Sequence, residues 1–323
     1  MKFVADVAHT VRLDVVALAV VVNCGGSGSA SGHELKNVTL APPPIDTCSE
    51  LFTAKEMDYF EKEGLDVDAK VLPSGKAISA GVLGGSLDGG CASIGSLAGA
   101  VARDLPLGVI PTGAVYNSEA PTSQLVVAAN SSISTVRDLE GRTIAVDPLT
   151  SFSQTGTQQW LDASEGDSAT TKFIEMPNVQ MAAALKSERV DPGLMVEPSL
   201  TTAKKAGVVR VIANPFDAVG KEFMITVIFS SDKLAKDQAD VVTKLQAALK
   251  RARSFSNDNP DKTAVMLSKY TDLPTETAES MTRASWPADL QYRELQGPLD
   301  NAPKYKVLSK PLNASAMLAP GVS

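Results

Sequence analysis

The 323-residue chain is long enough for about two domains, because domains usually span roughly 100 to 200 residues and single cores stop growing near about 300. Its 44% of hydrophobic and 21% of charged residues indicate a globular protein that can bury sizeable cores. Thirty Lys and Arg against 37 Asp and Glu leave a net charge of -7 with no basic cluster, which argues against a nucleic-acid partner.

The histidines and cysteines are too few for much catalytic chemistry. His9 and His33 both precede the first predicted strand, and the chain has only three cysteines. Zinc sites and histidine-based catalysis therefore have almost no residues to use. We expect no cofactor, no metal site and no catalytic residue.

The first 24 residues have the order of a secretory signal. Two basic residues, Lys2 and Arg12, precede an apolar stretch at 15–22 that is too short to span a membrane as a mature helix. Cys24 follows it directly and resembles the lipidated first mature residue of a bacterial lipoprotein. The Gly/Ser-rich residues 25–35 would then be a flexible tether, and the alternative is an N-terminus that is merely disordered.

The other two cysteines, Cys48 and Cys91, leave two alternatives open. They are either two buried thiols or, in an oxidising compartment, one disulfide.

From residue 36 short apolar runs alternate with longer helical patterns, which is typical of βαβ units and parallel sheets. The first set of expected elements is a strand at 38–41, a helix at 49–63, a strand at 65–72, a helix at 74–85, a strand and Gly/Ser turn at 88–96, a helix to residue 103 and a strand at 107–110.

A second set follows a strand at 124–129 that we expect to cross between lobes. It comprises a short helix and strand within 136–146, a polar segment at 147–157 before the helix that contains Trp160, strands at 172–176, 193–196 and 208–212, and helices at 179–187 and from Glu197 to Gly207. A second crossing strand is expected at 223–229, and the remainder is largely helical, with a core-facing stripe of Val241, Leu245, Leu249 and Ala252.

Six segments in this order resemble the substrate-binding proteins of ABC importers for nitrate, sulfonates, taurine and thiamine precursors. They are LFTAKEMDYFEKEGLDV at 51–67, GSLD with GC at 85–91, VRDLEGRTIAV at 136–146, MAAALKSERVD at 181–191, MVEP at 195–198 and the segment 252–260. Departures from the family pattern are Asp58 and the pair Glu188 and Arg189 in place of glycines, and Pro192 after Asp191. Asp58 tolerates the left-handed backbone that the family's glycine would adopt.

The resemblance implies an α/β fold of the type II periplasmic-binding-protein class, with two lobes of mixed sheet flanked by helices and joined by two crossing strands. Lobe 1 is expected to comprise 36–123 and 224–323, and lobe 2 to comprise 124–223. The implied function is extracytoplasmic capture of a small organic solute by clamshell closure. The implied partners are the solute, ABC permease subunits and, through a lipid anchor, the outer face of the cytoplasmic membrane, with the protein a monomer.

Ligands of such sheets bind beyond the carboxyl ends of the strands. The candidate ligand-binding residues are Asp46 and Thr47 after the first strand, Ser93, Ile94, Gly95 and Ser96 in the turn of lobe 1, Ser151, Phe152, Ser153, Gln154 and Thr155 at a helix start of lobe 2, and Glu197. Amide groups and hydroxyls at the helix start 151–155 could converge on an anionic group. Lys76 could meet an anion, although a solvated lysine is the simpler interpretation.

No arginine falls in these loops, so a doubly charged anion would have no bidentate clamp. A monoanion such as a sulfonate, or a zwitterion or neutral heterocycle with an amine facing Asp46 or Glu197, fits better. Two other functions are alternatives. One is a two-lobed sensor or partner-binding protein, and the other an enzyme of thiamine-pyrimidine synthesis, which the lack of histidine after His33 disfavours.

Overall fold

The structure, a computed structural model, describes residues 35–287 and 292–322. The predictions for the signal at 1–24, for Cys24 and for nearly all of the tether lie outside the described residues. None of the helices in the described ranges is long and apolar enough to cross a membrane.

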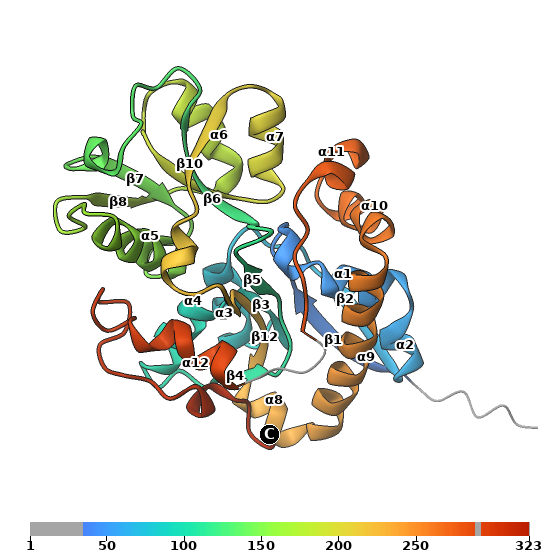
Figure 1. Ribbon diagram of the computed structural model, residues 1–323. Coiled ribbons are helices and arrows are strands. Elements are labelled where there is room, and N and C mark those ends of the chain that lie inside the picture. The colour runs from blue at the N-terminus through green and yellow to red at the C-terminus, as the bar shows by residue number, and fades with distance from the viewer. Residues whose placement is uncertain (1–34, 288–291, 323) are drawn as a thin grey trace, which may run out of the picture. The chain divides into compact units, whose positions relative to one another are not determined.

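The first sheet has the strand order β2-β1-β3-β12-β4 (Figure 1). Its strands are β2 (Leu65–Ala69), β1 (Lys36–Ala41), β3 (Gly89–Ser93), β12 (Thr226–Ser231) and β4 (Leu107–Ile110). The first three are parallel, whereas β12 runs antiparallel to β3 and β4. The chain therefore leaves this sheet after β4 and returns to its interior more than a hundred residues later.

The second sheet repeats this arrangement with the order β10-β6-β9-β7-β8. Its strands are β10 (Val209–Ala213), β6 (Ser123–Ala128), β9 (Gly193–Val196), β7 (Thr143–Val146) and β8 (Lys172–Glu175). Here β6 is antiparallel to β10 and β9, and β7 is parallel to β8 and β9. Two mixed sheets are thus present, and the predicted two-lobed fold is confirmed.

A two-stranded antiparallel ribbon carries the chain between the sheets. It pairs β5 (Val115–Asn117) with β11 (Glu222–Met224). The crossing strands were expected at 124–129 and 223–229, and both expectations need correction. The first is β6, a member of the second sheet, and the second is broken at Ile225 into β11 and β12, because the chain must leave the ribbon before it can join the first sheet.

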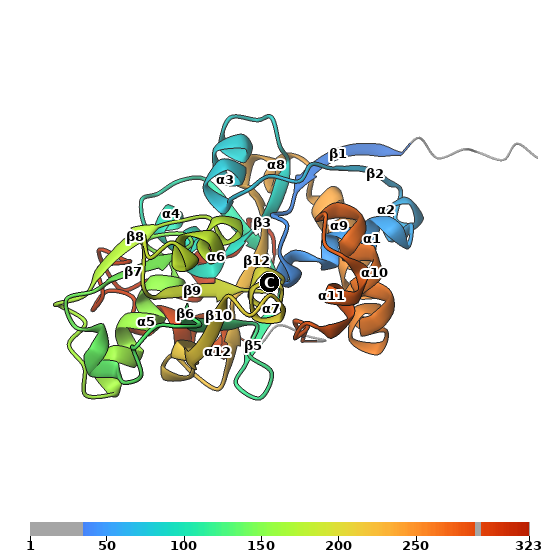
Figure 2. The same ribbon diagram turned by 90° about the horizontal axis from the view of Figure 1, so that it is seen from above.

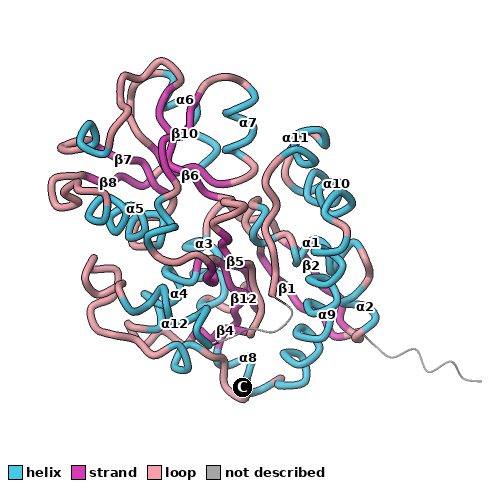
Figure 3. The backbone as a smooth tube through the Cα atoms, in the orientation of Figure 1, coloured by secondary structure: helices cyan, strands magenta, loops and turns pink. Residues whose placement is uncertain are grey.

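Helices cover both sheets (Figures 2 and 3). Those that follow strands of the first sheet are α1 (Glu50–Glu56), α2 (Tyr59–Lys62), α3 (Gly75–Leu83), α4 (Ile94–Val101) and α8 (Asp232–Asp237), and those of the second are α5 (Phe152–Ala163), α6 (Asn178–Lys186) and α7 (Ser199–Lys205). The C-terminal part adds α9 (Ala239–Asp258), α10 (Pro260–Tyr270), α11 (Thr275–Ser280) and α12 (Tyr292–Asp300), and the short 3-10 turns include η1 (Asp46–Cys48).

Two details of the helices bear on the predictions. The single helix expected at 49–63 is α1 and α2, interrupted at Asp58, whose φ of 55° is the left-handed value anticipated for this residue. The stripe on α9 lies in the core as predicted, because all four of its side chains are fully buried.

Cys48 and Cys91 form a disulfide that joins η1 to β3. Their Cα atoms lie 6.0 Å apart because β1, which precedes η1, is hydrogen-bonded to β3. Of the two alternatives that the sequence left open, the structure shows the bonded one.

Candidate functional site

A pocket lies between the two sheets and receives residues from both. It is lined by Pro43, Ile45, Thr47, Pro73, Ser74, Gly75, Ala92, Ser93, Ser96, Thr122, Ser123, Asp147, Pro148, Phe152, Ser153, Asn178, Val196, Glu197, Phe216, Ile225 and Thr226. Much of this lining comes from loops that directly follow strands, which is where ligands of α/β sheets bind. Six of the predicted residues are in it: Thr47, Ser93, Ser96, Phe152, Ser153 and Glu197.

The first-sheet wall contains the start of α4. Ser93 caps this helix: its hydroxyl accepts from the Ser96 amide at 3.2 Å and donates to the Ser96 hydroxyl at 2.8 Å. Ile94 points into the core and is fully buried, so the structure does not place it in the pocket. Gly95 is absent from the lining as well: a Cβ there would lie 3.2 Å from the amide nitrogen of Phe152, so its lack of a side chain lets α4 approach the start of α5.

The second-sheet wall contains the start of α5. Ser151 is the N-cap, and its hydroxyl accepts from the Ser153 amide at 3.2 Å. The Ser153 hydroxyl donates to the carbonyl of Asp147 at 3.0 Å. Gln154 accepts from the amide of Thr150, and Thr155 donates to the carbonyl of Ser151. Phe152 and Ser153 therefore face the pocket, whereas the other three predicted residues of this segment support the helix start.

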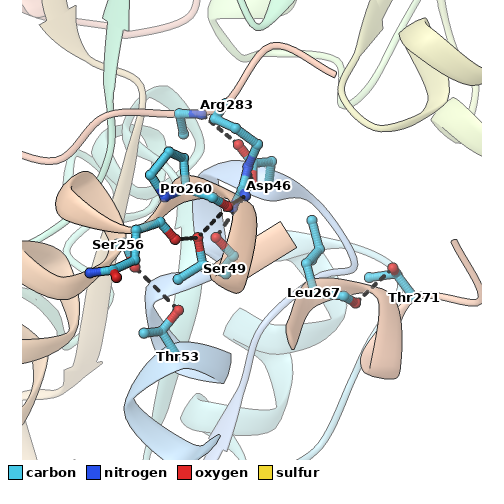
Figure 4. A network of polar contacts seen from close by, with 11 residues as sticks. Asp46, Ser49, Thr53, Ser256, Pro260, Leu267, Thr271 and Arg283 are labelled. Carbon is cyan, nitrogen blue, oxygen red and sulfur yellow. Dashed lines mark hydrogen bonds and ion pairs between the residues drawn. The ribbon is translucent and has the colours of Figure 1, made fainter. Parts of the chain in front are cut away.

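Asp46 is not a pocket residue, and the prediction that it faces the ligand is corrected. It is fully buried, and its Oδ1 accepts from Nε of Arg283 at 2.8 Å while its Oδ2 accepts from the amide of Ala284 (Figure 4). Its neighbour Thr47 does line the pocket and receives a hydrogen bond on its carbonyl from the Thr226 hydroxyl. Asp46 therefore ties the C-terminal segment to η1.

Glu197 lines the pocket and is also bonded to its own helix. Its two oxygens accept from the amide and the hydroxyl of Thr201 at 3.0 and 2.8 Å. Burial raises the pKa of this carboxyl, and these hydrogen bonds oppose the rise. The helix-start role that the sequence offered as the alternative is thus present, and a ligand contact stays a prediction.

Sequence reasoning missed Asp147, a half-buried carboxylate directly after β7. Its Oδ2 accepts from the backbone amide and the side-chain nitrogen of Asn178 at 3.1 and 3.3 Å. Asn178 in turn accepts from the amide of Val196 at 3.0 Å, which fixes its orientation. Burial raises the pKa of Asp147, with the bonds from Asn178 acting against it. A signal was available, since Asp147 is the first residue after a predicted strand.

Thr122 and Ser123 were also missed. Both are buried, line the pocket, and have hydroxyl oxygens without a hydrogen-bond partner among the described residues. Buried polar groups are nearly always paired, so two adjacent exceptions in a pocket are candidate contacts for a bound molecule. Ser123 is the first residue of β6 and Thr122 directly precedes it, and a prediction that began this strand at Gln124 had no reason to single them out.

Lys76 lies outside the lining. It is exposed and forms an ion pair with Glu175 of the second sheet, whose Oε2 also accepts from the amide of Leu149 at 3.1 Å. The simpler interpretation of Lys76 as a solvated surface lysine is therefore incomplete, because it reaches across to the other sheet. Within the described ranges, no group of three or more His, Cys, Asp or Glu side chains could hold a metal ion.

The profile of the NMT1/THI5-like family matches residues 47–263, which is more than half of the chain. The chain belongs to the NMT1/THI5-like family. The resemblance drawn from the six ordered segments is thereby confirmed. The comparison with curated proteins finds no significant match.

Solved structures share the fold at low sequence identity. The alkanesulfonate-binding protein SsuA from Xanthomonas axonopodis pv. citri is 19% identical with a TM-score of 0.74, covering 88% of this chain and 98% of that one. The periplasmic nitrate-binding protein NrtA from Synechocystis PCC 6803 is 15% identical with a TM-score of 0.66, covering 76% and 69%. The desulfurization enzyme DSZB is 14% identical with a TM-score of 0.65, covering 88% and 97%. The fold thus serves binding proteins and an enzyme.

Proposed function

We propose that the protein is an extracytoplasmic solute-binding component of an ABC importer that holds a small organic solute between its two sheets. The observation that carries this proposal is the pocket, which both sheets line and in which the hydroxyls of Thr122 and Ser123 have no partner among the described residues. Family membership and the named binding proteins of the same fold support it.

Closure would move lobe 2, residues 124–223, against lobe 1, residues 36–123 and 224–323. The β5–β11 ribbon supplies two short chain connections about which such a movement can occur. A solute that bonds to both lobes stabilises the closed state, because it gains contacts there that the open state lacks.

A thermal-shift screen tests solute capture. A ligand that binds only the native state stabilises it by RT ln(1 + [L]/Kd), about 2.7 kcal/mol at one hundred times Kd. Ser96→Phe should fill the pocket and abolish any shift, whereas Ser86→Phe, on an exposed serine elsewhere in the first lobe, should preserve it. A shift that survives Ser96→Phe would place the ligand elsewhere.

We propose binding without chemical conversion. The two described cysteines are joined in a disulfide, so neither offers a thiolate nucleophile, and the pocket hydroxyls of Thr122 and Ser123 have no base bonded to them. A ligand recovered from the protein after long incubation should have an unchanged mass. Recovery of a product would favour the enzymatic use of the fold represented by DSZB.

We further propose export and anchoring through Cys24. The disulfide is typical of an oxidising compartment, and the leader has the order of a lipoprotein signal. Cys24→Ala should move the protein from the membrane fraction to the soluble fraction, where size-exclusion chromatography should show a monomer. An unchanged membrane fraction would exclude the anchor. Co-purification of the anchored form with a permease would identify the importer.

A further inference from the structure

The charged side chains that line the pocket, among the described residues, are all acidic. Asp147 and Glu197 are carboxylates, and no lysine, arginine or histidine occurs among the described residues that line it. The rest of the polar lining consists of hydroxyls and Asn178. An anionic ligand would therefore enter a partly buried site that already holds negative charge and lacks a cation to offset it.

Two helix-start amides and one nearby lysine that could have offset an anion are already in use. At the start of α4 the Ser96 amide donates to Ser93, and at the start of α5 the Ser153 amide donates to Ser151. Lys76, the nearby cation, is paired with Glu175. Each of these bonds would have to be given up before an anion could use the donor.

Asp147 has one carboxylate oxygen that is available to accept a hydrogen bond from a ligand. Asn178 occupies its Oδ2 with two hydrogen bonds, and the amide of Val196 holds Asn178 in place. No hydrogen bond to Oδ1 of Asp147 occurs among the described residues, and the residue lines the pocket. Glu197 differs, because Thr201 bonds to both of its oxygens.

We infer that the solute is a neutral or cationic molecule that carries N–H donors, that Asp147 is the residue that accepts from them, and that simple anions such as nitrate and alkanesulfonates are excluded. This inference rests on the proposed solute capture in the same pocket. Asn178 is a positioning residue, and the free hydroxyls of Thr122 and Ser123 bond to other polar atoms of the solute.

The test uses probes of two skeletons, each with three head groups. Propyl and benzyl ammonium salts, the corresponding neutral carboxamides and the corresponding sulfonates, together with nitrate, are titrated into the full mature protein by calorimetry at low salt. We expect the ammonium and carboxamide probes to bind at least tenfold more tightly than the sulfonates and nitrate.

Asp147→Asn keeps an oxygen that can accept from Asn178 but removes the charge. It should weaken binding of the ammonium probes about tenfold or more and affect the carboxamides less. Asp66→Asn, on an exposed aspartate of β2 outside the pocket, is the matched control and should change neither.

Three results would overturn the inference. Tighter binding of sulfonates or nitrate than of the ammonium and carboxamide probes would do so and leave solute capture standing, as would equal affinity of Asp147→Asn and the unaltered protein for the ammonium probes. Binding by no probe at all would count against both the inference and the proposed capture.

Discussion

Asp46 and Asp147 occupy comparable places in the two sheets and have different roles. Each lies after a parallel strand, Asp46 in η1 after β1 and Asp147 directly after β7. Asp46 is fully buried and both of its oxygens are bonded to the segment at Arg283, whereas Asp147 is half-buried at the pocket. A position after a strand therefore brings a carboxylate toward the pocket. Contacts from a segment distant in the sequence then determine whether its oxygens are available to a ligand.

Like Asp46 itself, the residues that follow it at 48–50 contribute to the fold and not to the pocket, and together they form a first region. Ser49 lies beside it in the network of Figure 4, and the buried carboxyl of Glu50 and the disulfide of Cys48 lie close to it in the chain. Changes at Asp46 and at the disulfide should therefore reduce stability and spare ligand affinity. Changes at Asp147 should instead weaken ligand binding and leave stability nearly unaltered.

The largest effect is expected at Asp46. Asp46→Asn leaves the Arg283 guanidinium, only 12% exposed, without its carboxylate, and losing one partner of a buried ion pair typically costs about 3 to 5 kcal/mol. Urea denaturation should show this loss in the free energy of unfolding, against less than about 1 kcal/mol for Asp147→Asn. Comparable losses in the two variants would refute the division between the regions.

The second largest effect is expected when the disulfide is removed. The bridge closes a loop across a sequence separation of 43, for which the chain-entropy estimate is about 4 kcal/mol and typical measured values are about 2 to 4. The double variant Cys48→Ser, Cys91→Ser should lose this stability in denaturation under non-reducing conditions. Addition of a reductant should lower the stability of the unaltered protein and leave the double variant unchanged; an equal response of both would show that the bridge is not the cause.

Glu50 gives the first region a pH dependence. Burial raises its pKa from 4.5 to about 7, and the charge of Arg253 and the bond from Thr112 oppose this rise. Between these values the folded protein binds more protons than the unfolded chain, so this part of the stability is present below about pH 4.5 and is lost as the pH rises through about 7. The full loss is on the order of 3 kcal/mol.

Glu50→Gln removes the titrating group and should flatten the dependence of the unfolding free energy on pH across this window. Glu140→Gln, on an exposed glutamate of the other lobe, is the control and should keep the slope of the unaltered protein. A slope that persists in Glu50→Gln would assign it to other groups.

The sequence predicted those parts of the site that local patterns determine. Ser93 and Ser151 follow apolar strands and begin helices, and the structure places both as N-caps at the pocket or beside it. The prediction for Asp46 was wrong because its partner Arg283 is 237 residues away in the chain, and no local sequence pattern indicates that contact. Thr122 and Ser123 were missed because a hydroxyl at a strand end shows its lack of partners only after the surrounding chain is in place.

The smallest effect, and the one that most sharpens the comparison, is expected at these two hydroxyls. Thr122→Val and Ser123→Ala remove buried oxygens that have no partner among the described residues, so the free energy of unfolding should stay the same or rise slightly. If a bound solute pairs with them, each change should weaken its binding by about 1 kcal/mol. Calorimetry and urea denaturation of the same preparations measure both quantities. Loss of stability with unaltered affinity would move these residues to the structural class of Asp46, and the opposite pattern would place them with Asp147.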